Sequence, residues 1–196
     1  TSNLEIRRIA FLVCRGGWPK ASLKTNESAA LLEAREYVES VCRNDISRVD
    51  DVQRNAELAR RLMRSYSRHQ GAQVSVATIL ADIKSNEASD TTEATVASYI
   101  NALKRIFVIE DMAAWNPNLR SKTAIRSSDT RYFTDPSIAA AALGLGPDDL
   151  LDDPNTFGLL FETMAVRDLR VYAEALGGQV YHYRDKNGLE CDAIVH

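Results

Sequence analysis

The sequence predicts a mainly helical α+β chain that contains a winged helix-turn-helix and ends in a small α/β unit. Three observations favour this fold class. Apolar residues recur at helical spacing through most of the chain, two short β-prone runs follow a series of three helices, and a long final helix precedes a β-hairpin. A hydrophobic fraction of 45% with 26% charged residues is typical of a folded chain with its own core.

Composition excludes several function classes. The net charge of -3 gives no global positive field for nucleic acid, so any such contact must come from a local patch. The three cysteines are odd in number and widely spaced, which argues against a zinc ribbon or a disulfide framework and indicates buried thiols in a reducing cytoplasm. No apolar run approaches the roughly 20 residues that span a bilayer, so we expect a cytoplasmic protein without a membrane partner.

The first predicted domain, residues 1–50, is a helical segment. The apolar run Ile9–Cys14 is compatible with a strand or with the end of a helix, and Gly16-Gly17-Trp18-Pro19 interrupts it. From Glu27 to about Ile46, apolar residues return at helical spacing, which predicts an amphipathic helix.

The second predicted domain, residues 51–146, is a winged helix-turn-helix. The order of three helices and then a β-ribbon favours this interpretation more than any single residue does. The helices are expected at about Asn55–His69, Val76–Ile83 and Thr92–Ile106, and the ribbon strands at residues 107–109 and 131–133. A further helix should start at Asp135-Pro136, with Asp135 as its N-cap, and should end at Gly144.

The third predicted domain, residues 147–196, follows an acidic linker. We expect the linker from Leu145 to Asp153 and place the domain boundary in it. A long helix should then run from about Thr156 to Leu176, where Gly177-Gly178 ends it. A hairpin made of residues 181–185 and 190–195 completes this domain.

Glu162 is the acid of chemical interest on the final helix. It shares a stripe with small and apolar residues three, four and seven positions away, so its carboxylate should lie at the edge of the buried face or on it. An ionised carboxylate without a partner is strongly destabilising there, so we expect a metal ion, a base or a hydrogen-bond donor beside it. The structural alternative is an ion pair with an arginine such as Arg184.

The return strand of the hairpin adds Glu190 and Asp192, which strand alternation places on one face. A two-residue type I′ turn at Asn187-Gly188 would put Asp185 opposite Glu190 and Tyr183 opposite Asp192. The first of these pairs is repulsive, so either the loop is longer or a cation lies nearby.

Carboxylates that converge on one point form an oxygen-rich site for Mg²⁺. Such an ion polarises a phosphate and generates hydroxide for phosphodiester hydrolysis. Glu162 and Asp192 are the expected ligands; the alternative is that Asp192 is an ordinary strand acid. His182 has no ligand-like spacing to another histidine and is expected to be structural.

Several short motifs follow one another in a fixed order. They are Gly16-Gly17-Trp18-Pro19, Tyr37 through Asp45-Ile46, Tyr132-Phe133-Thr134-Asp135, Gly158-Leu159-Leu160-Phe161-Glu162-Thr163, Tyr183-Arg184-Asp185 and Glu190-Cys191-Asp192-Ala193-Ile194. Together they resemble the C-terminal domain of unknown function found in many prokaryotic AAA+ ATPases. There this region follows a P-loop module and resembles the PD-(D/E)XK nuclease fold.

The resemblance implies roles for three acids. Glu162 matches the helix acid and Asp192 the strand acid of the nuclease-like core, and Glu190 is the flanking acid. The Glu-x-Lys segment expected on the next strand is absent because the chain ends, so we expect a truncated PD-(D/E)XK-like half-domain that is inactive alone. The chain lacks an initiator methionine and a P-loop motif, so ATP could bind only through an upstream module of a longer polypeptide.

Basic side chains for a nucleic-acid contact cluster in the predicted wing. Arg120, Lys122 and Arg126 lie in one loop, with Arg131 at its base. The alternative is that these are solvated charges on a winged helix used for packing or protein contact. The sequence therefore predicts the C-terminal region of a prokaryotic AAA+ ATPase-family protein that acts on or near DNA, and the competing hypothesis is a non-catalytic interaction module of the ATPase.

Overall fold

The structure, a computed structural model, describes residues 3–85, 90–115, 128–184 and 188–196. Its helices are α1 (Ile6–Arg15), α2 (Pro19–Ser22), α3 (Glu27–Ser40), η1 (Val41–Asp45), α4 (Ile46–Arg48), α5 (Ala56–Arg68), α6 (Val76–Lys84), α7 (Glu93–Arg105), α9 (Pro136–Leu143), α10 (Pro147–Asp152) and α11 (Pro154–Ala175). Its strands, β1 (Val180–Arg184) and β2 (Glu190–Val195), form one antiparallel hairpin. The described residues are mainly helical with a small sheet, which confirms the predicted fold class at that level.

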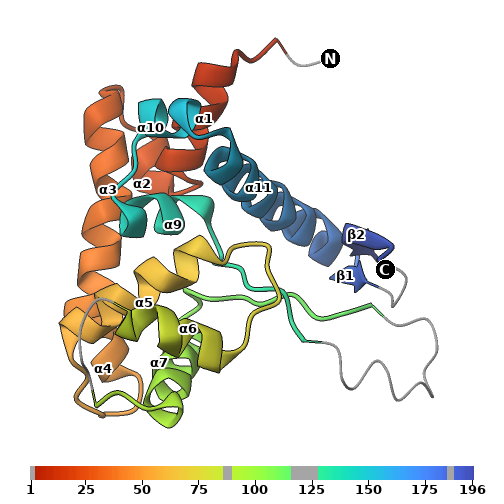
Figure 1. Cartoon of the computed structure of the whole chain (residues 1–196). Helices are drawn as coiled ribbons and strands as arrows, with labels where there is room; N and C mark the ends of the chain where they lie inside the picture. The colour runs from red at the N-terminus through yellow and green to blue at the C-terminus, as the bar shows by residue number, and fades with distance from the viewer. Residues whose placement is uncertain (1–2, 86–89, 116–127, 185–187) are drawn as a thin grey trace.

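Helix α9 lies at the centre of the helical body, and α11 leads away from that body to the hairpin (Figure 1). Contacts from α9 reach α1, α3, α5 and α11. Its sequence contains a run of four alanines, and Ile138, Ala139 and Ala140 are buried. Small side chains let neighbouring backbones approach closely, so four helices pack around this short one.

The first two predicted helical regions are present. The run Ile9–Cys14, which was left open between strand and helix, belongs to α1, and Gly16 ends this helix with a φ of 73°. The helix expected from Glu27 to about Ile46 is confirmed as the continuous run α3, η1 and α4. The π-helical η1 lies in its middle and includes the buried Cys42.

The three helices expected before the wing are confirmed as α5, α6 and α7. Each begins at a polar N-cap whose side chain accepts backbone N–H bonds: Asn55 for α5, Ser75 for α6 and Thr92 for α7. These caps satisfy donors that the first turn of a helix leaves free, which fixes where each helix begins.

The predicted β-ribbon is reduced to isolated bridges. Ile109 pairs with Phe133 and Met112 with Thr130, both antiparallel, in place of two regular strands. The same stretch continues to Ala114, which bridges His182 of β1 in parallel. The wing-like segment and the hairpin therefore form one irregular β-layer, and the winged-helix assignment stays a prediction.

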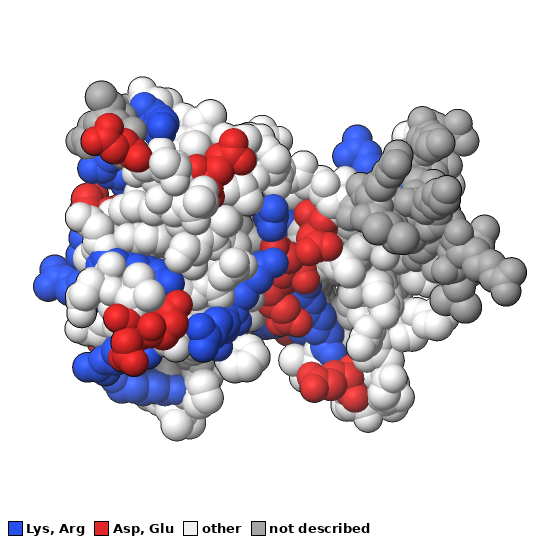
Figure 2. Space-filling model, turned by 90° about the horizontal axis from the view of Figure 1, so that it is seen from below, with Lys and Arg blue, Asp and Glu red and all other residues white. Residues whose placement is uncertain are grey.

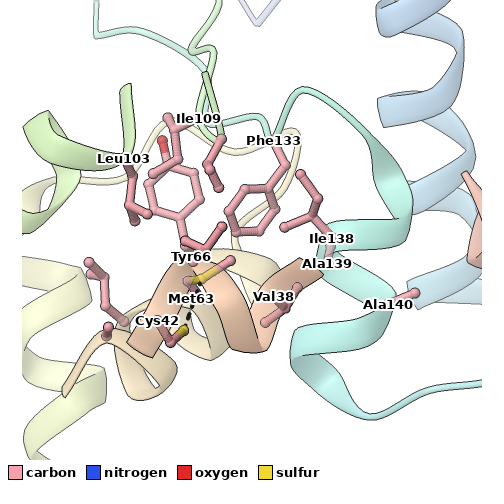
Figure 3. Packing of buried hydrophobic residues seen from close by; sticks show 14 of the residues in the cluster. Val38, Cys42, Met63, Tyr66, Leu103, Ile109, Phe133, Ile138, Ala139 and Ala140 are labelled. Carbon is pink, nitrogen blue, oxygen red and sulfur yellow. Dashed lines mark hydrogen bonds between the residues drawn. The ribbon is translucent and has the colours of Figure 1, made fainter. Parts of the chain in front are cut away.

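One hydrophobic cluster joins residues from α1 to α11. At its centre the rings of Tyr66 and Phe133 lie 5.2 Å apart, with Leu103, Ile109 and Ile138 around them (Figure 3). This cluster draws on all three predicted domains, whose boundaries stay predictions. Within the described ranges, no helix combines the length and the apolar composition needed to cross a bilayer.

The acidic linker expected from Leu145 to Asp153 is wrong. Residues Pro147–Asp152 form α10, which packs against α1 with Leu150 fully buried. Pro147 at the first helical position and Asp149, which accepts the Gly146 N–H at 2.7 Å, start this helix locally. The acidic composition suggested a linker, but burial of Leu150 stabilises a helix here.

The hairpin is present, and its register is not the one that a two-residue turn would give. Tyr183 lies opposite Cys191, not Asp192, and Arg184 lies opposite Glu190. A shift between Tyr181 and Tyr183 marks a β-bulge, because one residue of β1 there faces two of β2. Residues 185–189 connect the last pair, so the loop is longer than two residues, as the repulsion argument allowed; Asn187 lies outside the described residues.

Asp135 joins the two ends of the helical body. Its Oδ1 accepts the backbone N–H of Ser137 at 2.9 Å, which confirms the predicted N-cap of α9. Its Oδ2 accepts the Gly17 N–H at 2.9 Å and pairs with Arg167 of α11 at 2.7 Å. A Cβ on Gly16 would lie 2.4 Å from Oδ1, so the Gly16-Gly17 turn is shaped to fit this buried carboxylate.

Asp135→Ala is expected to lower the free energy of unfolding by about 3 kcal/mol, because it leaves Arg167 and the Gly17 N–H without their buried acceptor. Urea unfolding of wild type and variant measures this loss. Asp148→Ala is the matched control: its side chain is 78% exposed in a surface ion pair with Arg7, and the loss should stay below about 1 kcal/mol. Equal losses in the two variants would contradict the role given to Asp135.

Candidate functional site

The three acids selected from the sequence line one cavity. Glu162 comes from α11, and Glu190 and Asp192 from β2. The cavity has a volume of about 470 Å³ and its wall is mostly polar. It is also lined by residues from other parts of the chain: Gly71, Ala72, Gln73, Thr130, Tyr132, His182, Tyr183, Arg184 and Cys191.

Glu162 is half-buried, at the edge of the packed face of α11 as predicted. Its partner is the hydroxyl of Tyr132, which donates a short hydrogen bond to Oε1. Of the partners that the sequence left open, the structure therefore has a hydrogen-bond donor. Arg184 instead lies 3.7 Å from Glu190, so the ion pair suggested between Glu162 and Arg184 is not the one formed.

The cavity raises the pKa of Glu162. Burial is the largest cause, the hydrogen bond from Tyr132 opposes it, and the negative charges of Asp192 and Glu190 add to the increase. Burial also raises the pKa of Tyr132, so its hydroxyl keeps its proton and remains a donor. Ionising Glu162 in this cavity therefore costs free energy. Ionisable residues with perturbed pKa values are concentrated at functional sites.

The two strand acids are more accessible than Glu162. Glu190 and Asp192 are both exposed at the cavity rim. Strand alternation predicted that they share one face, yet Cys191 between them lines the same cavity. Cys191 is exposed there, so the buried thiol expected at this position is wrong, whereas Cys14 and Cys42 are buried.

His182 is buried and bonded within the protein, which agrees with the structural role predicted for it. Nε2 lies 3.1 Å from the carbonyl oxygen of Ser128, so this nitrogen carries the proton and Nδ1 accepts from the Gln73 amide at 3.1 Å. Burial lowers its pKa. Its backbone also accepts the Trp115 N–H at 2.6 Å and donates to Ala113 at 3.1 Å.

Of the four residues predicted to contact nucleic acid, the structure describes only Arg131. Arg120, Lys122 and Arg126 lie outside the described residues. Arg131 points inward: it bonds Asp111 at 2.5 Å and the Val74 carbonyl at 3.1 Å. Its guanidinium is therefore already neutralised by a protein carboxylate, which disfavours a phosphate contact at this position.

Helix α7, the third helix of the predicted winged helix-turn-helix, offers little free positive charge. Lys104 pairs with the same Asp111 at 2.8 Å, and Arg105 lies 3.7 Å from Asp50. On the face drawn in Figure 2, basic and acidic side chains lie next to each other around the central hollow. A phosphate backbone meets mixed charge there, not a single positive stripe.

Sequence reasoning missed two residues of the cavity. Tyr132 was part of a motif, and Gly71 follows the helix predicted at about Asn55–His69, but neither was connected with Glu162. A Cβ on Gly71 would lie 2.8 Å from Glu162 Oε1. These residues precede Glu162 by 30 and 91 positions, and no local pattern in the sequence signals that they meet it.

Glu162→Gln is expected to raise the melting temperature at pH 7 in the presence of EDTA. Glutamine keeps an acceptor for Tyr132 and removes a charge whose folded-state pKa is raised. A raised folded pKa means that the favourable contribution of Glu162 is complete below its unfolded pKa, about 4.3, and is lost as pH rises through the folded pKa.

The gain should therefore shrink as the pH is lowered from 7 to 4. Thermal unfolding followed by circular dichroism across this range measures it, with the exposed Glu36→Gln as the control. A constant difference at all pH values would show that the charge of Glu162 is not the cause.

Comparison with known proteins identifies a family for most of the helical body. Residues 6–149 match the model of a domain of unknown function, DUF8612. Searches of curated proteins and of solved structures found no match. The matched stretch begins with α1 and ends within α10, so it contains Gly71 and Tyr132 but not the three acids. Since the match covers well over half of its residues, the chain belongs to the DUF8612 family.

Proposed function

We propose that the cavity binds a divalent cation, Mg²⁺ in the cell, and serves a nuclease-like reaction on DNA. The observation that supports this most is the convergence of Glu162, Glu190 and Asp192 on one polar cavity. The chain would work as the C-terminal region of a prokaryotic AAA+ ATPase-family protein whose upstream module binds ATP. The resemblance of the ordered motifs supports that context.

The donor set suits an open site. Across the part of the chain that the structure describes, no three His, Cys, Asp or Glu side chains form a ready-made metal cluster. Mg²⁺ in phosphate-processing sites usually takes one or two carboxylates and completes its shell with water and substrate phosphate. Glu162 and Asp192 would be the two ligands, with Glu190 in support, and Gly71 leaves room for the carboxylate.

A bound ion would supply phosphate polarisation and an activated water. The protein's own residues have separate tasks. Glu162 presents a half-buried carboxylate oriented by Tyr132, and the exposed Asp192 approaches from the rim. Arg184 lies beside Glu190 at the same rim, where its positive charge would attract a phosphodiester.

The described residues that flank the predicted wing loop, Trp115 and Ser128, support a DNA substrate. Residues 116–127 carry Arg120, Lys122 and Arg126, and the chain on either side of them bonds to His182 in the cavity wall. Because Trp115 and Ser128 lie beside the cavity wall, this arrangement would suit a duplex bound near the carboxylates. The winged-helix assignment of α5 to α7 belongs to this proposal.

Wild-type protein is expected to bind Mn²⁺, used as a paramagnetic substitute for Mg²⁺, at the carboxylate cavity. Glu162→Gln and Asp192→Asn should each weaken binding by at least about tenfold, since even loss of a residue that only supports a metal ligand has effects of that size. Water-proton relaxation measures the affinity, and the exposed Asp148→Asn is the control. Absence of Mn²⁺ binding in wild type would remove the cation site.

DNA binding should weaken as salt rises, and the loop should account for part of that dependence. Replacing Arg120, Lys122 and Arg126 by alanine is expected to lower the slope of log K against log salt by about 2 to 3, roughly 0.9 for each lost phosphate contact. Fluorescence anisotropy with a short duplex measures the slope. Alanine at Arg7, Arg8 and Arg43, which form ion pairs at the surface, removes the same charge as a control. Unchanged slopes in both triple variants would exclude the loop as a DNA contact.

A second candidate function is a non-catalytic interaction module of the ATPase. Its support is a set of three exposed apolar side chains at helical spacing, Phe161 and Tyr172 on α11 and Leu176 at its C-cap. The Mn²⁺ experiment separates the two functions. This second function would be favoured if the wild-type chain binds no ion but associates with the ATPase module, and if Leu176→Asp abolishes that association.

A further inference from the structure

We propose that Tyr132 and Gly71 are positioning residues for Glu162, so that the cation site is assembled by two segments that lie outside the predicted nuclease-like domain. This inference rests on the proposed function, since it concerns the carboxylate that would bind the ion. The two residues act on the same oxygen. Tyr132 donates a hydrogen bond to Oε1, and Gly71 leaves the space that Oε1 occupies.

Tyr132 is a rigid donor. It is 1% exposed, and its ring packs with Met112, Val166 and Val180 in a small apolar cluster. Its carbonyl accepts the Glu110 N–H at 3.0 Å, which fixes the backbone beside the bridge at Met112. A buried phenol with two torsions held by packing can place its hydroxyl at only one point.

Arg170 holds the ring from the other side. Its guanidinium lies 5.7 Å from the centre of the Tyr132 ring and 3.6 Å from Glu110. Arg170 lies on α11, two turns after Glu162. The helix that carries Glu162 therefore also contacts the ring of Tyr132, which orients Glu162. The hydroxyl, the ring and the helix therefore move as one unit.

Gly71 sets the shape of the cavity beside Glu162. Its φ of +69° is in the left-handed region, and its N–H donates to the Arg131 carbonyl at 3.0 Å, so the backbone is held against the segment that carries Tyr132. Any side chain there would meet Oε1 at 2.8 Å. Glycine is thus required twice, for its backbone conformation and for the carboxylate.

Tyr132→Phe tests the hydrogen bond. Mn²⁺ affinity, measured by water-proton relaxation, should fall by about 10- to 100-fold, as for other residues that orient a metal ligand. Tyr172→Phe is the control, because Tyr172 is exposed on α11. Melting temperatures in EDTA establish that both variants are folded.

A merely structural effect is separated from positioning by repeating Tyr132→Phe in two backgrounds. If Tyr132 acts through Glu162, Tyr132→Phe weakens the affinity of Asp192→Asn further but leaves the residual affinity of Glu162→Ala, which has no acceptor for the hydroxyl, unchanged. Equal losses in both backgrounds would overturn the positioning role.

Gly71→Ala tests the space, with Gly144→Ala as its matched control. Both glycines have positive φ, +69° and +79°, so the backbone strain is similar, but only at Gly71 would a Cβ meet another atom within 4 Å. Mn²⁺ affinity should fall at least about tenfold in Gly71→Ala and stay at the wild-type value in Gly144→Ala.

The outcomes distinguish the two proposals. A wild-type protein that binds Mn²⁺, together with unchanged affinity in Tyr132→Phe and Gly71→Ala, overturns the positioning role and leaves the cation site. A wild-type protein that binds no Mn²⁺ overturns both.

Discussion

The buried carboxylate of Asp135 is the interaction on which the arrangement of the site depends. It accepts from Gly17 after α1, caps α9 at Ser137 and pairs with Arg167 of α11. A buried charge is tolerated only when its partners are all in place, so these three elements are held together or not at all. Arg167 lies five residues after Glu162 on the same helix, so the direction that Asp135 imposes on α11 also directs Glu162 toward the cavity.

The family match and the candidate site divide the chain differently. The matched region ends at residue 149 and excludes all three acids, yet it contains both Gly71 and Tyr132, which contact Glu162. Asp135 likewise bridges the matched region and α11. A cavity whose acid comes from one segment and whose walls come from another forms only in the folded chain, which is a strong reason to treat the matched domain and the final helix as one physical unit.

The sequence predicted what depends on local chemistry. Helices α5, α6 and α7 follow from apolar spacing and from caps such as Asn55, and Asp135-Pro136 marked α9 correctly. The hairpin was predicted, but its register was not, because a bulge facing His182 displaces the pairing and the turn alone does not encode it. Helix α10 was taken for a linker because its acidic composition concealed one buried leucine, Leu150.

Of the site, the acids were predictable and their surroundings were not. Glu162 stood out as a charge on an apolar stripe, whereas Tyr132 and Gly71 are ordinary residues until the fold brings them to Oε1. These long-range contacts depend on how α11 packs against the β-layer. No local sequence pattern determines that packing.

The cavity combines rigid walls with an uncompensated acid. The side chains of Tyr132 and His182 are buried, and their polar atoms form hydrogen bonds within the protein. Glu162, in contrast, has a raised pKa and lies beside two further acids. At pH 7 the charge of Glu162 lowers the stability of the fold, because burial and the negative charges of Asp192 and Glu190 oppose its ionisation. Retaining the charge where the backbone also bends through Gly71 at positive φ is consistent with a ligand that supplies the missing positive charge. In the proposed function that ligand is a divalent cation, whose binding would offset the repulsion that the folded protein carries without it.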